Sequence, residues 1–127
     1  MVSMKRRSGF TLIELLVVMA IIASLLTIAV PRYFSSLEQS RETTLRQSLA
    51  VMRDALDQYY GDTGSYPENL ETLVEQRYLR ALPVDPITER SDQWLLLPPA
   101  EGIPGGVADI RSGADGRARD GSLYAEW

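Results

Sequence analysis

FTLIELLVVMAIIASLLTIAV, at residues 10–30, is the stretch that decides the fold, because 17 of its 21 residues are apolar. As a helix that rises about 1.5 Å per residue, it is about 32 Å long. The hydrocarbon core of a bilayer is about 30 Å thick, so one such helix can cross it. Residues 31–127 carry 10 basic and 16 acidic side chains. The sequence therefore predicts an apolar helix joined to a polar globular part.

The charges that flank this run predict an orientation in the membrane. Lys5, Arg6 and Arg7 precede the run, and only Arg32 closely follows it. Because basic residues accumulate on the cytoplasmic side, we expect a cytoplasmic N-terminus and a C-terminal part beyond the membrane. A cleaved secretory signal is disfavoured, since its apolar core would be only about 7–15 residues long. A plain membrane anchor is an alternative.

The composition excludes several classes of function. The chain has no histidine and no cysteine, which excludes imidazole and thiol catalysis, disulfides and the zinc sites built on these residues. A net charge of −4 argues against nucleic-acid binding, which requires a basic surface. Neighbouring acids such as Asp54 and Asp57 fit a solvated helix face, so the sequence predicts no enzyme.

Glu14 lies inside the apolar run, where an acidic side chain is costly and indicates a function. A cut between Gly9 and Phe10 would create an α-amine on Phe10 that is mostly protonated near neutral pH. Phe10 and Glu14 would then be i, i+4 neighbours on one helix face. The carboxylate could pair with its own amine or with that of an adjacent subunit, and the second pairing would set the stagger between stacked helices.

The stretch KRRSGFTLIEL, at residues 5–15, resembles the prepilin processing site of type IV pilins and type II secretion pseudopilins. The resemblance implies that a prepilin peptidase removes residues 1–9 and methylates the new amine of Phe10. Glu14 is then the fifth mature residue, and Pro31 stands where the family has a proline. It also implies a transmembrane or filament-core helix at 10–30 and a periplasmic pilin-like domain at 31–127.

Pro31 allows two interpretations. It lacks an amide hydrogen and its ring crowds the carbonyl of Thr27, so a helix must kink or loosen there. Pro31 could be a boundary proline that ends one helix and starts another. Alternatively it is a flexible point that lets subunits pack and stretch in a filament, as the resemblance implies.

A second helical pattern follows, over residues 32–60. Apolar residues recur at spacings of three and four: Leu45, Leu49, Met52, Leu56 and Tyr59. Such a stripe indicates a helix with one buried face, packed on a sheet or, alternatively, in a partner's groove. Gly61 and Gly64 are expected to stop it. Together with the apolar run this makes one helix of about fifty residues, with a transmembrane half and an amphipathic half.

The remaining residues predict an α+β fold. A short helix is expected over 66–76 with Pro67 in its first turn, followed by a loop that buries Leu79 and Leu82. Strands are expected at 93–97, 107–111 and 122–127, separated by turns rich in proline and glycine. We therefore predict a pilin-like fold in which the long N-terminal helix packs on a small three-stranded antiparallel sheet.

Three further stretches, GDTGSYPENLETLV, LPVDP and SGADG, resemble the G-type major pseudopilin of type II secretion. The absence of cysteine favours this branch over pilins closed by a disulfide. The resemblance implies calcium in the last turn, with the backbone carbonyl of Ser112 and the carboxylates of Asp115 and Asp120 as ligands, since calcium prefers such oxygens. Alternatively, turn hydrogen bonds and ion pairs with nearby arginines hold this turn without metal.

The resemblance implies a structural subunit of a periplasmic pseudopilus that is processed and polymerised to drive type II secretion. Its implied partners are further copies of itself in a helical filament, the prepilin peptidase, the inner-membrane assembly platform and minor pseudopilins. We expect a single-pass inner-membrane protein before assembly and a periplasmic filament afterwards. A minor type IV pilin of a pilus or competence machine, and a membrane-anchored binding module that does not polymerise, are the alternatives.

Overall fold

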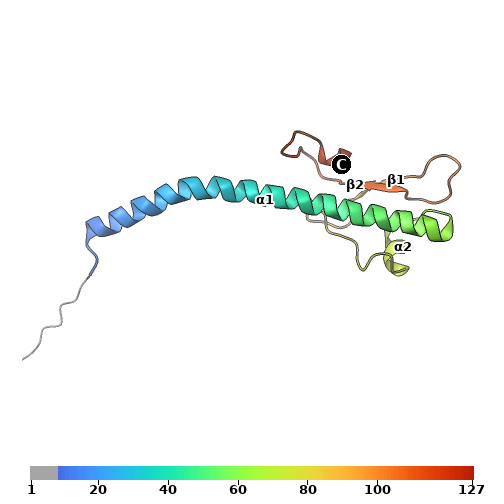
Figure 1. The fold of residues 1–127 in the computed structure, drawn as a ribbon, viewed down its shortest axis with the longest axis horizontal. Coiled ribbons are helices and arrows are strands. Elements are labelled where there is room, and N and C mark those ends of the chain that lie inside the picture. Colours follow the sequence, from blue (N-terminus) through green and yellow to red (C-terminus); the bar gives the residue numbers. More distant parts are fainter. Residues whose placement is uncertain (1–8) are drawn as a thin grey trace, which may run out of the picture. The chain divides into compact units, whose positions relative to one another are not determined.

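The computed structural model describes residues 9–127, so Lys5, Arg6, Arg7 and most of the predicted leader lie outside the described residues. The elements follow the order α1, α2, β1, β2 and a short 3-10 turn, η1 (Figure 1). The described residues divide into two compact units, one that ends at Leu37 and one that spans residues 38–127. The second unit thus begins a few residues after Pro31, where the sequence places the start of the globular domain.

The first unit is helical from the start of α1 (Leu12–Thr63). Every residue from 9 to 36 is exposed, including the whole apolar run. The hydroxyls of Ser24 and Thr27 donate to carbonyls one turn earlier, at 2.8 Å, so these polar groups are satisfied within the helix. Among the described residues, α1 alone contains a stretch long and apolar enough to cross a membrane, judged by length and composition.

Pro31 lies inside α1, which continues beyond it. The interpretation of Pro31 as a boundary between two helices is therefore wrong. The proline still cannot donate to the carbonyl of Thr27, because it has no amide hydrogen. The hydroxyl of Thr27 itself bridges the carbonyls of Ala23 and Ser24, at 2.8 Å each. A flexible point at Pro31 stays a prediction, and it concerns one missing hydrogen bond in an unbroken helix.

The second unit contains the hydrophobic core, and the apolar stripe of α1 lies at its centre. Leu45, Leu49, Met52 and Leu56 are at most 1% exposed, and Tyr59 packs against them. Full burial of such a side chain stabilises the fold by roughly 1.5–3 kcal/mol. The other buried core residues are Ala55, Leu70, Leu73, Leu79, Trp94, Val107 and Ile110. The stripe is thus confirmed as core, and the alternative of a partner's groove is wrong.

The long helix ends later than its first glycine. α1 ends at Thr63, and Gly64 follows with a φ of +78°, the left-handed conformation that often closes a helix. The amide of Gly64 donates to the carbonyl of Tyr60 at 2.8 Å. Gly61, the first predicted stop, lies in the last turn of α1, because one glycine weakens a helix without ending it.

α2 (Leu70–Glu75) is shorter than the helix predicted over 66–76. Asn69 is its N-cap, and the side-chain oxygen of Asn69 accepts an amide of the first turn at 2.9 Å. Pro67 therefore precedes the helix, which corrects its predicted place in the first turn. Its carbonyl accepts the amides of residues 106 and 107, at 3.0 and 2.9 Å. This tertiary pairing holds Pro67 outside the helix, which begins only after Asn69.

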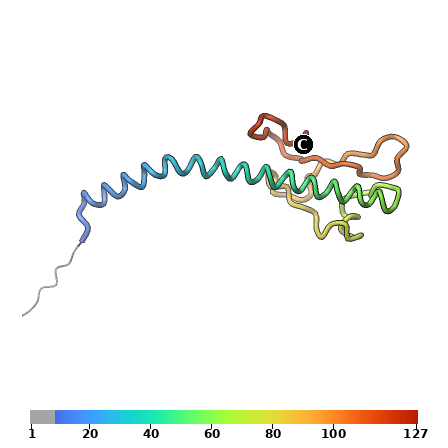
Figure 2. Tube along the Cα trace, in the orientation of Figure 1, coloured from blue at the N-terminus to red at the C-terminus, as the bar shows by residue number. Residues whose placement is uncertain are grey.

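The sheet consists of two antiparallel strands, β1 (Leu95–Leu97) and β2 (Asp109–Arg111), with Leu96 opposite Ile110. The orange part of the Cα trace, which contains them, runs alongside the last turns of α1 (Figure 2). The α+β pilin-like class is confirmed, but the third predicted strand, at 122–127, is wrong. That segment forms one isolated bridge and η1 (Tyr124–Glu126) instead.

Side-chain hydrogen bonds explain why the last segment is not a strand. The amide and hydroxyl of Ser122 both donate to Oδ1 of Asp120, at 2.9 and 2.6 Å, which closes a tight turn where the strand was expected to begin. At the other end, the carbonyl of Trp127 accepts a hydrogen bond from Nη2 of Arg53 at 2.6 Å. The segment is therefore held by side chains rather than by a ladder of backbone hydrogen bonds.

Candidate functional site

The predicted processing site lies on exposed backbone. Gly9 and Phe10 precede the helix, and the Phe10 side chain is 76% exposed. No atom beyond the adjacent residues lies within 4 Å of the position that a Cβ of Gly9 would occupy. The peptide bond between Gly9 and Phe10 is thus sterically open to a protease within the described chain.

Glu14 lies at the start of α1, where it takes part in a capping box with Thr11. The amide of Glu14 donates to the hydroxyl of Thr11 at 3.2 Å, and the amide of Thr11 lies 3.5 Å from Oε2 of Glu14. This is the reciprocal pattern of the Thr-x-x-Glu motif, in which each side chain satisfies an unpaired amide of the first turn. The Thr-x-x-Glu pattern is visible in the sequence, but it was not predicted from the charge of Glu14.

The C-terminal loop, residues 112–122, contains the three predicted calcium ligands, and the structure gives them different environments. Ser112 is fully buried, and its hydroxyl donates a hydrogen bond to Oδ2 of Asp85. Asp115 and Asp120 are both exposed. The buried partner Asp85 was missed as a site residue, although the quoted LPVDP motif contains it.

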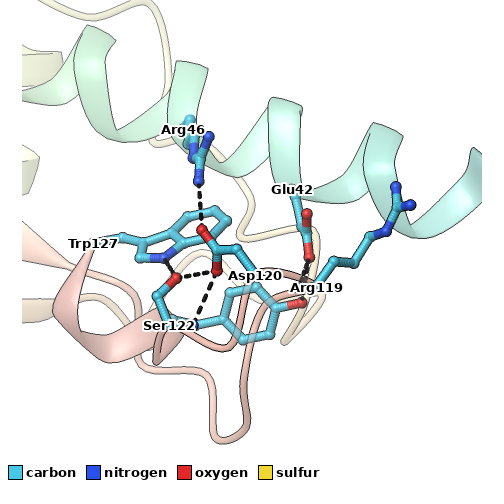
Figure 3. Close-up of polar contacts among 7 residues, drawn as sticks. Glu42, Arg46, Arg119, Asp120, Ser122 and Trp127 are labelled. Carbon is cyan, nitrogen blue, oxygen red and sulfur yellow. Dashed lines mark hydrogen bonds and ion pairs between the residues drawn. The ribbon is translucent and has the colours of Figure 1, made fainter.

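Asp120 is held by a group of side chains from the loop and from α1 (Figure 3). Its Oδ1 accepts both hydrogen bonds of Ser122, and its Oδ2 lies 3.7 Å from Nη2 of Arg46. The hydrogen bonds from Ser122, together with the charge of Arg46, lower the pKa of Asp120 below its usual value. Arg46 also lies over the Trp127 ring, with its guanidinium carbon 4.3 Å from the centroid.

A second contact between α1 and the loop lies one helical turn before Arg46. Oε1 of Glu42 accepts the amide of Arg119 at 2.7 Å and lies 3.4 Å from the hydroxyl of Tyr124. Burial, and then the charge of Glu42, raise the pKa of the Tyr124 hydroxyl. Glu42 and Arg46, four residues apart on α1, thus present a carboxylate and a guanidinium cation to the same loop (Figure 3).

The predicted calcium ligands do not form a ready set of donors. Ser112, whose backbone carbonyl is the expected ligand, is fully buried, and both carboxyl oxygens of Asp120 already face hydrogen-bond donors or a cation. Within residues 9–127, no group of three or more acidic, histidine or cysteine side chains is placed to hold a metal ion. Asp120 therefore does not fit the ligand role that the resemblance implies, and calcium binding stays an untested expectation.

Comparison with known proteins agrees with the N-terminal motif. Residues 4–30 match the family model of the prokaryotic N-terminal methylation motif. The matched segment contains the predicted processing site and Glu14 and extends to the end of the apolar run.

Curated relatives extend the similarity to the globular part. The chain is 35% identical to the type II secretion system core protein G of Pseudomonas aeruginosa, over 65% of this chain and 69% of that protein. It is 31% identical to the protein of the same name from Klebsiella pneumoniae, over 98% and 96% of the two chains. It is also 28% identical to the fimbrial protein EcpC of Eikenella corrodens, over 94% and 81%. No solved structure gives a significant match.

Proposed function

The chain belongs to the family of the type II secretion system core protein G, and on this premise we propose that it is the polymerising subunit of a periplasmic pseudopilus. The family is a structural component of a secretion machine and not an enzyme. In this proposal the precursor is anchored in the inner membrane by residues 10–30, with the C-terminal unit in the periplasm. Filament growth then drives the export of folded proteins.

The proposed assembly begins with cleavage between Gly9 and Phe10 by a prepilin peptidase, which also methylates the new amine. Cleavage leaves the amine one helical turn from Glu14, in a run that contains no basic residue. The amine of an incoming subunit pairs with the Glu14 carboxylate of its neighbour and fixes the register between them. The inner-membrane assembly platform and minor pseudopilins are the further partners of this step.

The observation that carries the proposal is the exposure of the apolar run on every face. All residues from 9 to 36 are exposed, so the described chain offers no cover for them. Water is an unfavourable environment for them, because each Å² of apolar surface exposed to water costs about 25 cal/mol of free energy. Lipid before assembly, and the helices of other copies after it, supply the two apolar environments.

Replacement of Glu14 tests the proposal. Glu14→Ala should still be inserted and cleaved, as judged by the mass of the mature N-terminus, but should give no sheared filaments. Glu14→Gln separates two roles, because glutamine can serve in a capping box but carries no charge. We expect it to fail as well. Asp54→Ala, at an exposed acid on the amphipathic half of α1, should assemble normally.

Abundant filaments from Glu14→Ala would contradict the register proposal. Filaments from Glu14→Gln but not from Glu14→Ala would assign the effect to helix capping and not to charge. The similarity to EcpC favours one second candidate, a subunit of a type IV pilus. Filaments that extend beyond the cell surface at native expression, without loss of protein export in a deletion strain, would support that candidate.

A further inference from the structure

We propose that side chains alone close the C-terminal loop on α1, and that Arg46 supplies the positive charge that a metal ion would otherwise supply at Asp120. The inference concerns how the globular unit is held together and does not depend on the proposed function. It assigns a positioning role to Arg46, and it predicts that the loop is closed in the absence of calcium.

The first support is a closed ring of contacts among four side chains (Figure 3). Nη2 of Arg46 lies 3.7 Å from Oδ2 of Asp120. Oδ1 of Asp120 accepts a hydrogen bond from the hydroxyl of Ser122 at 2.6 Å. Nε1 of Trp127 donates a hydrogen bond to the hydroxyl oxygen of Ser122 at 2.8 Å, and the Trp127 ring stacks on the guanidinium of Arg46. Each member therefore contacts two others, an arrangement in which hydrogen bonds reinforce one another.

The second support is that Arg46 does not act by its ion pair alone. The side chains of Arg46 and Asp120 are 62% and 59% exposed, and such a pair is worth only about 0–1 kcal/mol. The stacking on Trp127 restricts the guanidinium and adds a cation–π contact. Arginine is suited to this double role, because its planar group can stack and pair at once.

The third support is that α1 holds the loop at two places. Glu42 accepts a hydrogen bond from the backbone amide of Arg119 at 2.7 Å, and Arg119 directly precedes Asp120 in the chain. Arg46, which faces Asp120, lies one turn after Glu42 on the helix. The helix therefore places an acceptor against the loop backbone and a cation against the loop carboxylate. Two anchors of opposite sign fix both the position and the orientation of the turn at residues 119–122.

The charges around the loop also oppose a metal ion. A divalent cation at Asp120 would have to displace the guanidinium of Arg46 and would be repelled by the arginines within the loop. Arg117 is tied to the loop itself, since its Nη1 donates to the carbonyl of Gly121 at 2.8 Å. The hydroxyl of Ser112 is engaged inside the core by Asp85. Asp120 is thus already held by donors and a cation that calcium would have to displace.

The test is thermal unfolding of the full chain in detergent micelles, followed by tryptophan fluorescence. The wild-type protein is measured in EGTA, in millimolar CaCl2 and in millimolar MgCl2. We expect the same midpoint in all three. Arg46→Ala should lower the midpoint by about 4–8 °C, which corresponds to about 1 kcal/mol in a domain of this size. Arg46→Lys keeps the charge and should lose only part of that shift.

Arg41→Ala is the matched control, because Arg41 is an exposed arginine on the same helix that makes none of the contacts of Arg46. Its midpoint should stay within about 1 °C of the wild type, well below the shift that a contribution of about 1 kcal/mol gives. A midpoint raised by calcium but not by magnesium, or lowered by EGTA, would overturn the inference. So would equal midpoints for Arg46→Ala and Arg41→Ala. A loss in Arg46→Lys as large as in Arg46→Ala would show that charge is not what Arg46 supplies.

Discussion

The hydroxyl of Ser112 donates a hydrogen bond to the carboxyl group of Asp85, and neither side chain is exposed to solvent. The other oxygen of Asp85 accepts the amides of Ile87 and Thr88, at 2.8 and 3.3 Å. The oxygen of Ser112 in turn accepts the amide of Ala114 at 3.1 Å. Two loops that are far apart in the sequence are therefore joined by one buried polar contact.

Asp85→Ala should destabilise the globular unit by about 2–4 kcal/mol, because it leaves two amides and a buried hydroxyl without their acceptor. Urea unfolding of the full chain in micelles, followed by tryptophan fluorescence, measures the change. Asp92→Ala is the control, since it removes only an exposed ion pair with Arg90 and should cost about 0–1 kcal/mol. Equal losses in the two variants would mean that the buried contact contributes nothing specific.

Gly113→Ala should be strongly destabilising, by about 2 kcal/mol or more, because a Cβ there would overlap the carbonyl oxygen of Gln93. Gly61→Ala is its control. It lies inside α1 with open space around the added carbon and should be neutral or stabilising by up to about 1 kcal/mol. The urea midpoint of Gly113→Ala should therefore fall, and that of Gly61→Ala should stay unchanged or rise. A Gly113→Ala protein as stable as the wild type would show that the two loop segments can separate without cost.

Arg53→Ala should loosen the C-terminal segment. Arg53 donates to the carboxyl group of Asp109 and to the carbonyls of Ile110 and Trp127, at 2.6–2.9 Å. Its side chain is 36% exposed, so solvent screens part of the gain, and we expect a loss of about 1–2 kcal/mol. Hydrogen exchange should rise in residues 122–127. Arg80→Ala, at an exposed arginine, should leave that exchange unchanged.

Tyr78 provides a prediction in alkaline solution. Its hydroxyl donates to Oδ2 of Asp62 at 2.7 Å, and this hydrogen bond, followed by burial and the charge of Asp62, raises the pKa of Tyr78 above 10.0. Because the folded pKa is raised, the stabilisation is fully present below pH 10 and is lost as the pH rises through the folded pKa.

The difference in tyrosinate absorbance between the wild type and Tyr78→Phe isolates this titration. Asp62→Asn should move the pKa of Tyr78 back toward its ordinary value, since the negative charge is gone. An unchanged titration in Asp62→Asn would rule out Asp62 as the cause. Asp57→Asn, at an exposed acid on the same helix, serves as the control.

The sequence predicted what depends on local pattern. The length of the apolar run and the three–four spacing from Leu45 to Tyr59 are each visible within a few turns, and both were confirmed. The end of α1 was predicted to within one turn, because either glycine could have closed it. Such features are decided by neighbours in the chain.

What was missed depends on contacts across the chain. The segment 122–127 has the composition of a strand. However, Arg53 donates to its last carbonyl and Ser122 donates to Asp120, and the segment does not join the sheet. Pro67 fits the first turn of a helix, yet its carbonyl accepts the amides at 106–107 and it lies before α2. Neither partner could be identified from spacing alone. The pairing of Asp120 with Arg46 was missed for the same reason, since it joins residues 74 positions apart.

The hydrophobic core of the globular unit begins at Leu45, and none of residues 9–44 is buried. A change in the surroundings of residues 10–36 therefore leaves every buried contact of that unit intact. The globular unit stays folded when the surroundings of residues 10–36 change. Its free energy of unfolding and the free energy of moving that helix into another medium are separate quantities. A mutation can therefore alter one without the other.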